Sequence, residues 1–342
     1  MPATKVLVVG RGAMGILWGS SIHSPALPVS FIDAPNLPLD FTLGIIPAPD
    51  SSTIITGLPC PTISQSDLPA YLTPSTIVFV CVKAHQITQA LQPIVSVSQS
   101  SMPYIILLHN GLPSRKTTEF LSSHAPHAYS MVTSRGATLL QRSEIPPPYS
   151  IVARATGPGP SFLFPNSPNA IQTLPEAFTA TLPDTVLLPH ASGLCEQILK
   201  LAVNVALNGT LAYLSLQSTP PRRIVNFEMS SHLDLAVDVA RLVLHRAYLK
   251  APNEHLGAAI GSDLAASRTR ETMAKVPQNV CSTVVDITNG RQTEREALLD
   301  AVMGWGVAEE ETDDARLFLE EIHAALLKHD AHVDDIEQWA RI

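Results

Sequence analysis

The sequence predicts an α/β domain with a doubly wound, mostly parallel sheet, followed by an all-helical domain. Three observations support this prediction. Short apolar runs alternate with helical stretches in the first half of the chain, apolar residues recur at three- and four-residue spacing after His190, and the prolines cluster between the apolar runs. A chain of 342 residues is long enough for two hydrophobic cores. We place the two domains at residues 1–188 and 189–342.

Five apolar or β-branched runs predict the strands of the first domain, and three helical stretches between them predict right-handed crossovers. Several of the runs are apolar throughout, which is typical of a parallel sheet covered on both faces. Residues 140–188 are rich in proline and glycine, and we interpret them as the edge of the sheet and a connector. The predicted strands are residues 5–9, 29–33, 76–82, 104–108 and 129–133, and the predicted helices are residues 14–22, 86–91 and 115–121.

The second domain is predicted to be helical throughout. Its helices are expected at residues 198–214, 234–248, 297–302 and 313–328, where apolar residues fall on one face of a helix. Exposed apolar faces on the last of these would permit a homodimer without requiring one.

Composition restricts the partners and the compartment. The net charge of −8 argues against a nucleic-acid or anionic-membrane partner, since both need a basic face. The four cysteines are scattered, so neither a metal site nor a disulfide framework is predicted. We expect no signal peptide and no apolar run near the ~18 residues of a membrane helix. These observations predict a cytoplasmic protein, for which an anionic small molecule remains possible as a ligand because a local cationic site is enough to bind it.

A glycine-rich turn follows the first predicted strand directly. The segment Gly10-Arg11-Gly12-Ala13-Met14-Gly15 has the G-x-G-x-x-G spacing and opens a predicted helix. Such a turn allows the backbone to approach a pyrophosphate, which the N–H groups and the dipole of the new helix then bind. This context predicts a Rossmann-type dinucleotide site. The alternative interpretation is a glycine turn that serves packing alone.

The end of the second predicted strand bears on which dinucleotide binds. Asp33 follows Gly10 by 23 positions, about where an acidic residue binds the ribose 2′-hydroxyl of NAD. No Lys or Arg lies between Arg11 and Lys83, so the usual partner of the 2′-phosphate of NADP is missing. Arg11 could supply that charge from inside the turn, and Asp33 could instead be a turn residue before Pro35.

A polar stripe interrupts an apolar helix in the second domain. Lys200, Asn204 and Asn208 are spaced by four residues, which places them on one helix face, and all residues between them are apolar. An ammonium and two amides could bind a carbonyl or carboxylate group. The alternative is a stripe that faces solvent. Periodicity alone gives Ser282, Asp286 and Glu294 as ordinary polar surface.

Together these residues resemble the ketopantoate reductase family (2-dehydropantoate 2-reductases). The resemblance covers most of the chain in the family's order and rests on five segments. They are the strand and turn at residues 6–15, the Val-Lys-Ala-His-Gln segment ending at residue 86, the His-Asn-Gly segment at residues 109–111, the Lys200 stripe, and the segment with Ser282, Asp286, Arg291, Thr293 and Glu294.

The resemblance implies reduction of a 2-oxo acid by NADPH or NADH. Lys200 would be the general acid that protonates the developing alkoxide, and Glu294 would orient Lys200 or bind a substrate hydroxyl. The implied substrate-binding residues are Asn110, Asn204, Asn208 and Ser282. The implied cofactor-binding residues are the turn Gly10 to Gly15 together with Lys83 and Asn110, to which the strand-end argument adds Asp33.

Three departures from the family pattern concern the cofactor and the substrate. Ala34 stands where the family commonly has the arginine that selects NADPH, and Gly209 replaces a proline after the stripe. An Asn-Gly pair and a later proline are missing after Glu294. The departures leave the proposed acid and its partners in place, so the leading interpretation is the reaction that the resemblance implies, reduction of 2-dehydropantoate to pantoate, toward pantothenate. The same chemistry on another 2-oxo acid or ketone in secondary metabolism, and a dinucleotide-binding regulator without catalysis, are the alternatives.

Overall fold

The computed structural model divides the chain into two compact units, each described here by itself. The first comprises Met1–His109 and Arg115–Gly193, and the second comprises Asn110–Ser114 and Leu194–Ile342. The sequence placed a single boundary between residues 188 and 189, whereas the short segment Asn110–Ser114 groups with the second unit. The structure describes residues 4–32, 42–46, 55–59, 62–98, 102–125, 128–140, 142–145, 149, 151–157, 159–168, 174–306 and 312–339.

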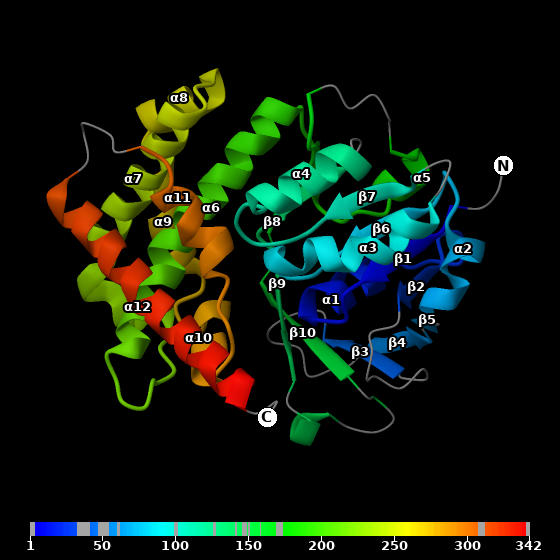
Figure 1. Cartoon of the computed structure of the whole chain (residues 1–342), viewed down its shortest axis with the longest axis horizontal. Coiled ribbons are helices and arrows are strands. Elements are labelled where there is room, and N and C mark those ends of the chain that lie inside the picture. The colour runs from blue at the N-terminus through cyan, green and yellow to red at the C-terminus, as the bar shows by residue number, and fades with distance from the viewer. Residues whose placement is uncertain are drawn as a thin grey trace. The chain divides into compact units, whose positions relative to one another are not determined.

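The first unit is built on an eight-stranded sheet (Figure 1). Its strand order is β12-β11-β8-β7-β6-β1-β2-β5. All neighbouring pairs are parallel except β8 and β11, which run antiparallel. The bounds are β1 Val6–Val9, β2 Val29–Ile32, β5 Thr62–Ile63, β6 Ile77–Val80, β7 Tyr104–Leu107, β8 Tyr129–Thr133, β11 Ser161–Pro165 and β12 Thr185–Leu187.

The five strands predicted from apolar runs all lie in this sheet, and the predicted α/β fold class is confirmed. Four of the five, β1, β2, β6 and β8, are buried along their whole length, as expected for a sheet covered on both faces. The proline-rich stretch that we interpreted as the edge of the sheet supplies β11 and β12, which do form its edge. The helices of this unit are α1 Ala13–Ile22, α2 Leu68–Tyr71, α3 Ile87–Val97, α4 Arg115–His124 and α5 Glu176–Thr179.

A second, four-stranded sheet was not predicted. Its order is β4-β3-β10-β9, and it packs against α1, which also packs on β1 and β2 of the large sheet. Helix α1 is therefore covered on two sides, which explains why Trp18 is fully buried. The bounds are β3 Thr42–Ile46, β4 Ile55–Pro59, β9 Gly136–Leu139 and β10 Ile151–Gly157.

The second unit is helical, as predicted. Its core is formed by buried apolar residues of α6, α7 and α12, and α7 also packs on α8 and α9. The predicted helix at residues 297–302 is a π-helical turn, Glu296–Asp300, that continues into α11. The helices are α6 His190–Leu216, α7 Leu233–Lys250, α8 Glu254–Gly261, α9 Leu264–Lys275, α10 Ser282–Thr288, α11 Ala301–Met303 and α12 Asp313–Trp339.

Helix α6 corrects one expectation. By length and composition it could cross a membrane, so the statement that no apolar run approaches that length does not hold for it. However, 72% of its most apolar window is buried inside the protein. A core helix needs the same apolar character, and its burial accounts for the composition of α6.

Candidate functional site

The glycine turn begins where β1 ends. Gly10 has a φ of +101°, and a Cβ there would lie 2.3 Å from the carbonyl oxygen of Cys81, the residue that follows β6. Both the backbone conformation and the space therefore require glycine at this position. The approach of the two strand ends is fixed by a hydrogen bond of 2.7 Å from the Cys81 N–H to the carbonyl oxygen of Val9.

The turn has the features of an anion site at a helix N-terminus. Gly12 is the N-cap of α1, and nothing lies within 4 Å of a Cβ built on it. The first turn of α1 carries no acidic residue. Free N–H groups, the positive end of the helix dipole and open space at Gly12 all fit a dinucleotide pyrophosphate.

The charged residues around the turn differ in accessibility. Arg11 is 7% exposed, so its side chain is directed into the protein. Lys83 is partly exposed, three residues after the end of β6, and its N–H donates to Oε1 of Gln86 at 3.3 Å. Asp33 and Ala34 lie outside the described residues. The preference for NAD or NADP therefore stays a prediction from the sequence.

The polar stripe is the accessible face of an otherwise buried helix. From Ile198 to Ala212, every residue of α6 is buried except Lys200, Asn204 and Asn208, which are partly exposed. The four-residue spacing thus places the three side chains on one face, as expected. None of them is fully exposed either, so the alternative of a freely solvated stripe does not describe them.

Glu294 connects this face to a distant part of the sequence. Its side chain is buried at 8% exposure, and its Oε2 accepts a hydrogen bond of 3.0 Å from Nδ2 of Asn110. Burial lowers the pKa of Lys200 to about 8, while the charge of Glu294 opposes this shift. The structure therefore brings together Lys200, Glu294 and Asn110. An ammonium with a pKa near neutrality can donate a proton to a reacting oxygen at physiological pH.

The backbone beside Asn110 requires a second special glycine. Gly111 has a φ of +70°, and its Cβ would lie 2.2 Å from the carbonyl oxygen of Ala297. The next N–H, of Leu112, donates to that same oxygen at 2.9 Å, and Nε2 of Gln197 on α6 donates to the Gly111 carbonyl at 3.3 Å. These contacts hold the segment Asn110–Ser114 against the turn that follows Glu294.

Helical periodicity predicted that Ser282, Asp286 and Glu294 are surface residues, which is correct for Ser282 and wrong for Asp286 and Glu294. Ser282 is exposed at the start of α10, as a surface residue would be. Asp286 is 5% exposed, and its Oδ1 pairs with Nη2 of Arg291 at 3.1 Å. Glu294 is buried as described above. Their burial depends on contacts with other segments, which the spacing within one helix cannot show.

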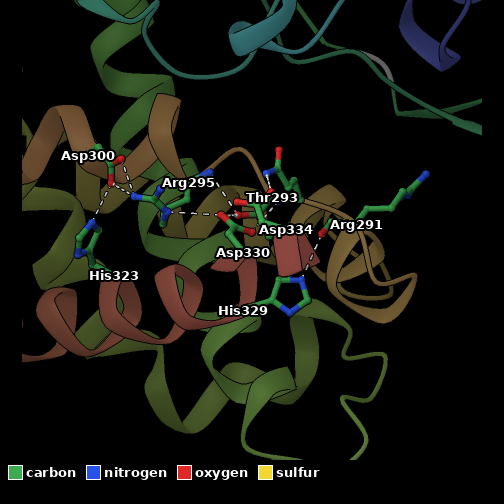
Figure 2. A network of polar contacts seen from close by, with 9 residues as sticks. Arg291, Thr293, Arg295, Asp300, His323, His329, Asp330 and Asp334 are labelled. Atoms are coloured by element: carbon green, nitrogen blue, oxygen red, sulfur yellow. Dashed lines mark hydrogen bonds and ion pairs between the residues drawn. The ribbon is translucent and has the colours of Figure 1, made fainter. Parts of the chain in front are cut away.

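A network of polar contacts that the sequence did not indicate includes Thr293 and Arg295, the chain neighbours of Glu294 (Figure 2). It joins the segment from Arg291 to Asp300 to helix α12. Its members are Arg291, Gln292, Thr293, Arg295 and Asp300 on one side and His323, His329, Asp330 and Asp334 on the other. Within the described ranges, no group of three or more His, Cys, Asp or Glu residues could hold a metal ion.

Comparisons with known proteins agree with the resemblance seen in the sequence. Residues 6–151 match the model of the family described as "Ketopantoate reductase PanE/ApbA". No curated protein matches the chain.

Solved structures match over nearly the whole chain. A PanE/ApbA family ketopantoate reductase from Ralstonia eutropha JMP134 is 17% identical with a TM-score of 0.67, and the match covers 95% of this chain and 99% of that one. A dimeric ketopantoate reductase from Staphylococcus aureus is 15% identical, with a TM-score of 0.64 and coverage of 96% and 99%. D-mandelate dehydrogenase in complex with NADH is 19% identical, with the same TM-score and coverage. At these identities the matches establish a shared fold.

Proposed function

We propose that the protein is a ketopantoate reductase that reduces 2-dehydropantoate to pantoate with NADPH or NADH, and the match of residues 6–151 to that family's model supports the proposal. The observation that carries the proposal is the group Lys200, Glu294 and Asn110, in which a partly buried lysine has a pKa of about 8. The glycine turn, which fits a pyrophosphate, supports a dinucleotide as the second ligand.

Each residue has a distinct task in the proposed reaction. A bound nicotinamide supplies the hydride to the ketone carbon. Lys200 donates a hydrogen bond to the ketone oxygen and then its proton as negative charge develops there. Glu294 favours the charged form of Lys200, and Asn110 holds the carboxylate of Glu294. Asn204, Asn208 and Ser282 are proposed to bind the carboxylate and hydroxyl groups of the substrate.

The experiment that tests the proposal is a turnover assay. The protein is mixed with NADH or NADPH and a panel of 2-oxo acids that includes 2-dehydropantoate, and absorbance at the nicotinamide band is followed. We expect turnover of 2-dehydropantoate that falls as pH rises through about 8, because Lys200 must be protonated. Lys200→Ala should lose turnover and still bind the cofactor. Undiminished turnover in that variant would refute Lys200 as the acid.

A second candidate substrate is another 2-oxo acid or ketone. The similarity of the fold to D-mandelate dehydrogenase, whose complex contains NADH, favours this alternative, as do the departures at Ala34 and Gly209. The same panel decides, because the preferred substrate has the highest kcat/KM. A regulator without catalysis would oxidise the cofactor with none of the substrates.

The cofactor preference is open to a separate measurement. Asp33 and the missing basic residue at Ala34 favour NAD, whereas the family favours NADP. We expect tighter binding of NADH than of NADPH, and a smaller difference in Asp33→Ala, since the 2′-phosphate would no longer meet a carboxylate. A preference for NADPH in the unchanged protein would exclude this role of Asp33.

The proposed setting is the cytoplasm, with a homodimer as the assembly. Cys81, Cys195 and Cys281 are free thiols, which suits a reducing compartment. The dimer is supported by the description of the Staphylococcus aureus structure as dimeric. Sedimentation at micromolar concentration tests the assembly, and a monomer would refute it.

A further inference from the structure

The segment that carries Glu294 is fastened to helix α12 by one buried carboxylate. The backbone N–H of Thr293 donates to Oδ1 of Asp330 at 3.0 Å, and its hydroxyl donates to Oδ2 at 2.9 Å. Oδ2 of Asp330 also forms an ion pair of 3.4 Å with Nε of Arg295. Asp330 therefore contacts the residue before Glu294 and the residue after it (Figure 2).

The charge of Arg295 is shared with a second carboxylate. Nη1 of Arg295 donates a hydrogen bond of 2.5 Å to Oδ2 of Asp300, which is the last residue of the π-helical turn. Nε2 of His323 on α12 lies 2.8 Å from Oδ1 of the same Asp300. The two flanks of Glu294 are thus tied to α12 directly through Asp330 and indirectly through Asp300.

The inner contacts of the network are buried and the outer contacts are exposed. Asp330 is 8% exposed and Thr293 is 5% exposed. By contrast, the hydrogen bonds between Gln292 and Asp334 and between His329 and Arg291 lie at the surface. Solvent competes with the exposed contacts, so they contribute little, whereas loss of a buried charged acceptor leaves its donors unpaired. The position of Glu294 therefore depends on Asp330 far more than on Asp334.

We propose that Asp330 is a positioning residue of the site, which fixes Glu294 by holding Thr293 and Arg295 on either side of it. Asp330 acts through Glu294: when the segment is held, the carboxylate of Glu294 stays on Asn110 and its charge acts on Lys200. Removing Asp330 frees the segment and weakens the influence of Glu294 on Lys200. The inference deepens the proposed function and rests on it, because Lys200 is there the general acid.

The test measures the titration of Lys200 in a way that does not depend on turnover. The protein is treated with acetic anhydride across a range of pH, and acetylation of the peptide that contains Lys200 is quantified by mass spectrometry. Only the neutral amine reacts, so the curve reports the pKa of Lys200. The variants are Asp330→Ala and the nearly isosteric Asp330→Asn, with Asp334→Asn as the matched control on the same helix.

We expect the titration midpoint of Lys200 to move to lower pH in both Asp330 variants and to stay unchanged in Asp334→Asn. The direction follows because the negative charge of Glu294 raises the pKa of Lys200. The kcat for the preferred substrate should fall about tenfold in Asp330→Ala, and the high-pH limb of its pH profile should move the same way. A variant that is merely less stable would lose active protein with an unchanged profile.

Two results would overturn the inference. One is an unchanged Lys200 midpoint in both Asp330 variants, whatever happens to activity, and the other is an equal shift in Asp334→Asn. If Asp330→Ala does not fold, Asp330→Asn and Thr293→Val, which removes one buried hydrogen bond, give the same comparison. If the unchanged protein reduces no 2-oxo acid, the proposed function fails, while the Lys200 titration still decides the role of Asp330.

Discussion

At the scale of single residues, Lys200 carries a positive charge at a position where burial disfavours it. Lys200 lies on a helix whose neighbouring positions are all buried, and burial lowers its pKa from 10.5 to about 8. A lowered lysine pKa means that the folded state disfavours the charged form. An apolar side chain at this position would not carry this penalty, so Lys200 lowers the free energy of unfolding of the protein.

We therefore predict that Lys200→Met raises the free energy of unfolding at pH 7 by on the order of 1 kcal/mol, because the gain from removing the desolvated ammonium is partly offset by leaving the buried carboxylate of Glu294 without its cation. The unfolded state binds the proton more tightly than the folded state, so the penalty is complete below pH 8 and disappears toward pH 10.5. The gain of the variant should shrink over that range in urea titrations. Lys275→Met, at an exposed position of α9, is the control and should change little. A gain that does not depend on pH would contradict the explanation.

The sequence predicted the residues of the stripe better than it predicted their partners. Spacing within one helix is a local property, so Lys200, Asn204 and Asn208 could be placed on one face in advance. Glu294 was selected through the family resemblance, since its hydrogen bond to Asn110 spans 184 positions. Asp330 was missed because nothing in its own helix indicates that it will meet Thr293, 37 positions away.

At the scale of elements, prediction succeeded where apolar runs were long and buried. The strands β1, β6 and β7 were recognised by their uninterrupted apolar character. The small sheet was missed because its strands are stabilised by pairs between distant segments, such as β3 with β10. β-propensity depends on such neighbours more than on the strand's own sequence. The expected helix at 297–302 was found with an irregular, partly π-helical geometry, which periodicity does not resolve.

The contact between the segment Asn110–Ser114 and the turn after Glu294 gives a prediction about these elements. In Gly111→Ala the new Cβ would meet the carbonyl oxygen of Ala297 at 2.2 Å, and the φ of +70° would be strained. The segment must shift, which breaks the bond from Leu112 to Ala297 and withdraws Asn110 from Glu294. We expect kcat to fall at least tenfold, with unchanged affinity for the dinucleotide measured by fluorescence titration.

The matched control for this variant is Gly261→Ala. Gly261 is the last residue of α8, and nothing lies within 4 Å of its Cβ. Activity should be unchanged there, and stability unchanged or slightly higher, because alanine restricts the unfolded chain more than glycine does. Normal turnover in Gly111→Ala would show that the position of Asn110 does not matter for the reaction.

At the scale of the whole molecule, the residues that the structure describes form two hydrophobic cores, one in each unit. One surrounds the large sheet and includes Trp18, Phe31 and Phe79, and the other is made by the helices of the second unit. The glycine turn belongs to the first unit, and Lys200, Glu294 and Asp330 belong to the second. The proposed cofactor site and the proposed acid–base group are therefore supported by different cores, and mutations should separate them.

This separation leads to a prediction about thermal stability. A ligand that binds only the folded state at 100 times its Kd stabilises it by about 2.7 kcal/mol, which corresponds to a rise in Tm of about 5 °C or more for a domain of this size. The preferred dinucleotide should raise the Tm of the unchanged protein and of Lys200→Met alike. Gly10→Ala should abolish the rise, because its Cβ would collide with the carbonyl oxygen of Cys81 and distort the turn. Differential scanning fluorimetry measures all three, and a normal rise in Gly10→Ala would mean that the dinucleotide binds elsewhere. If Lys200→Met also loses the rise in Tm, the lysine contributes to cofactor binding. The two tasks are then not divided between the two cores.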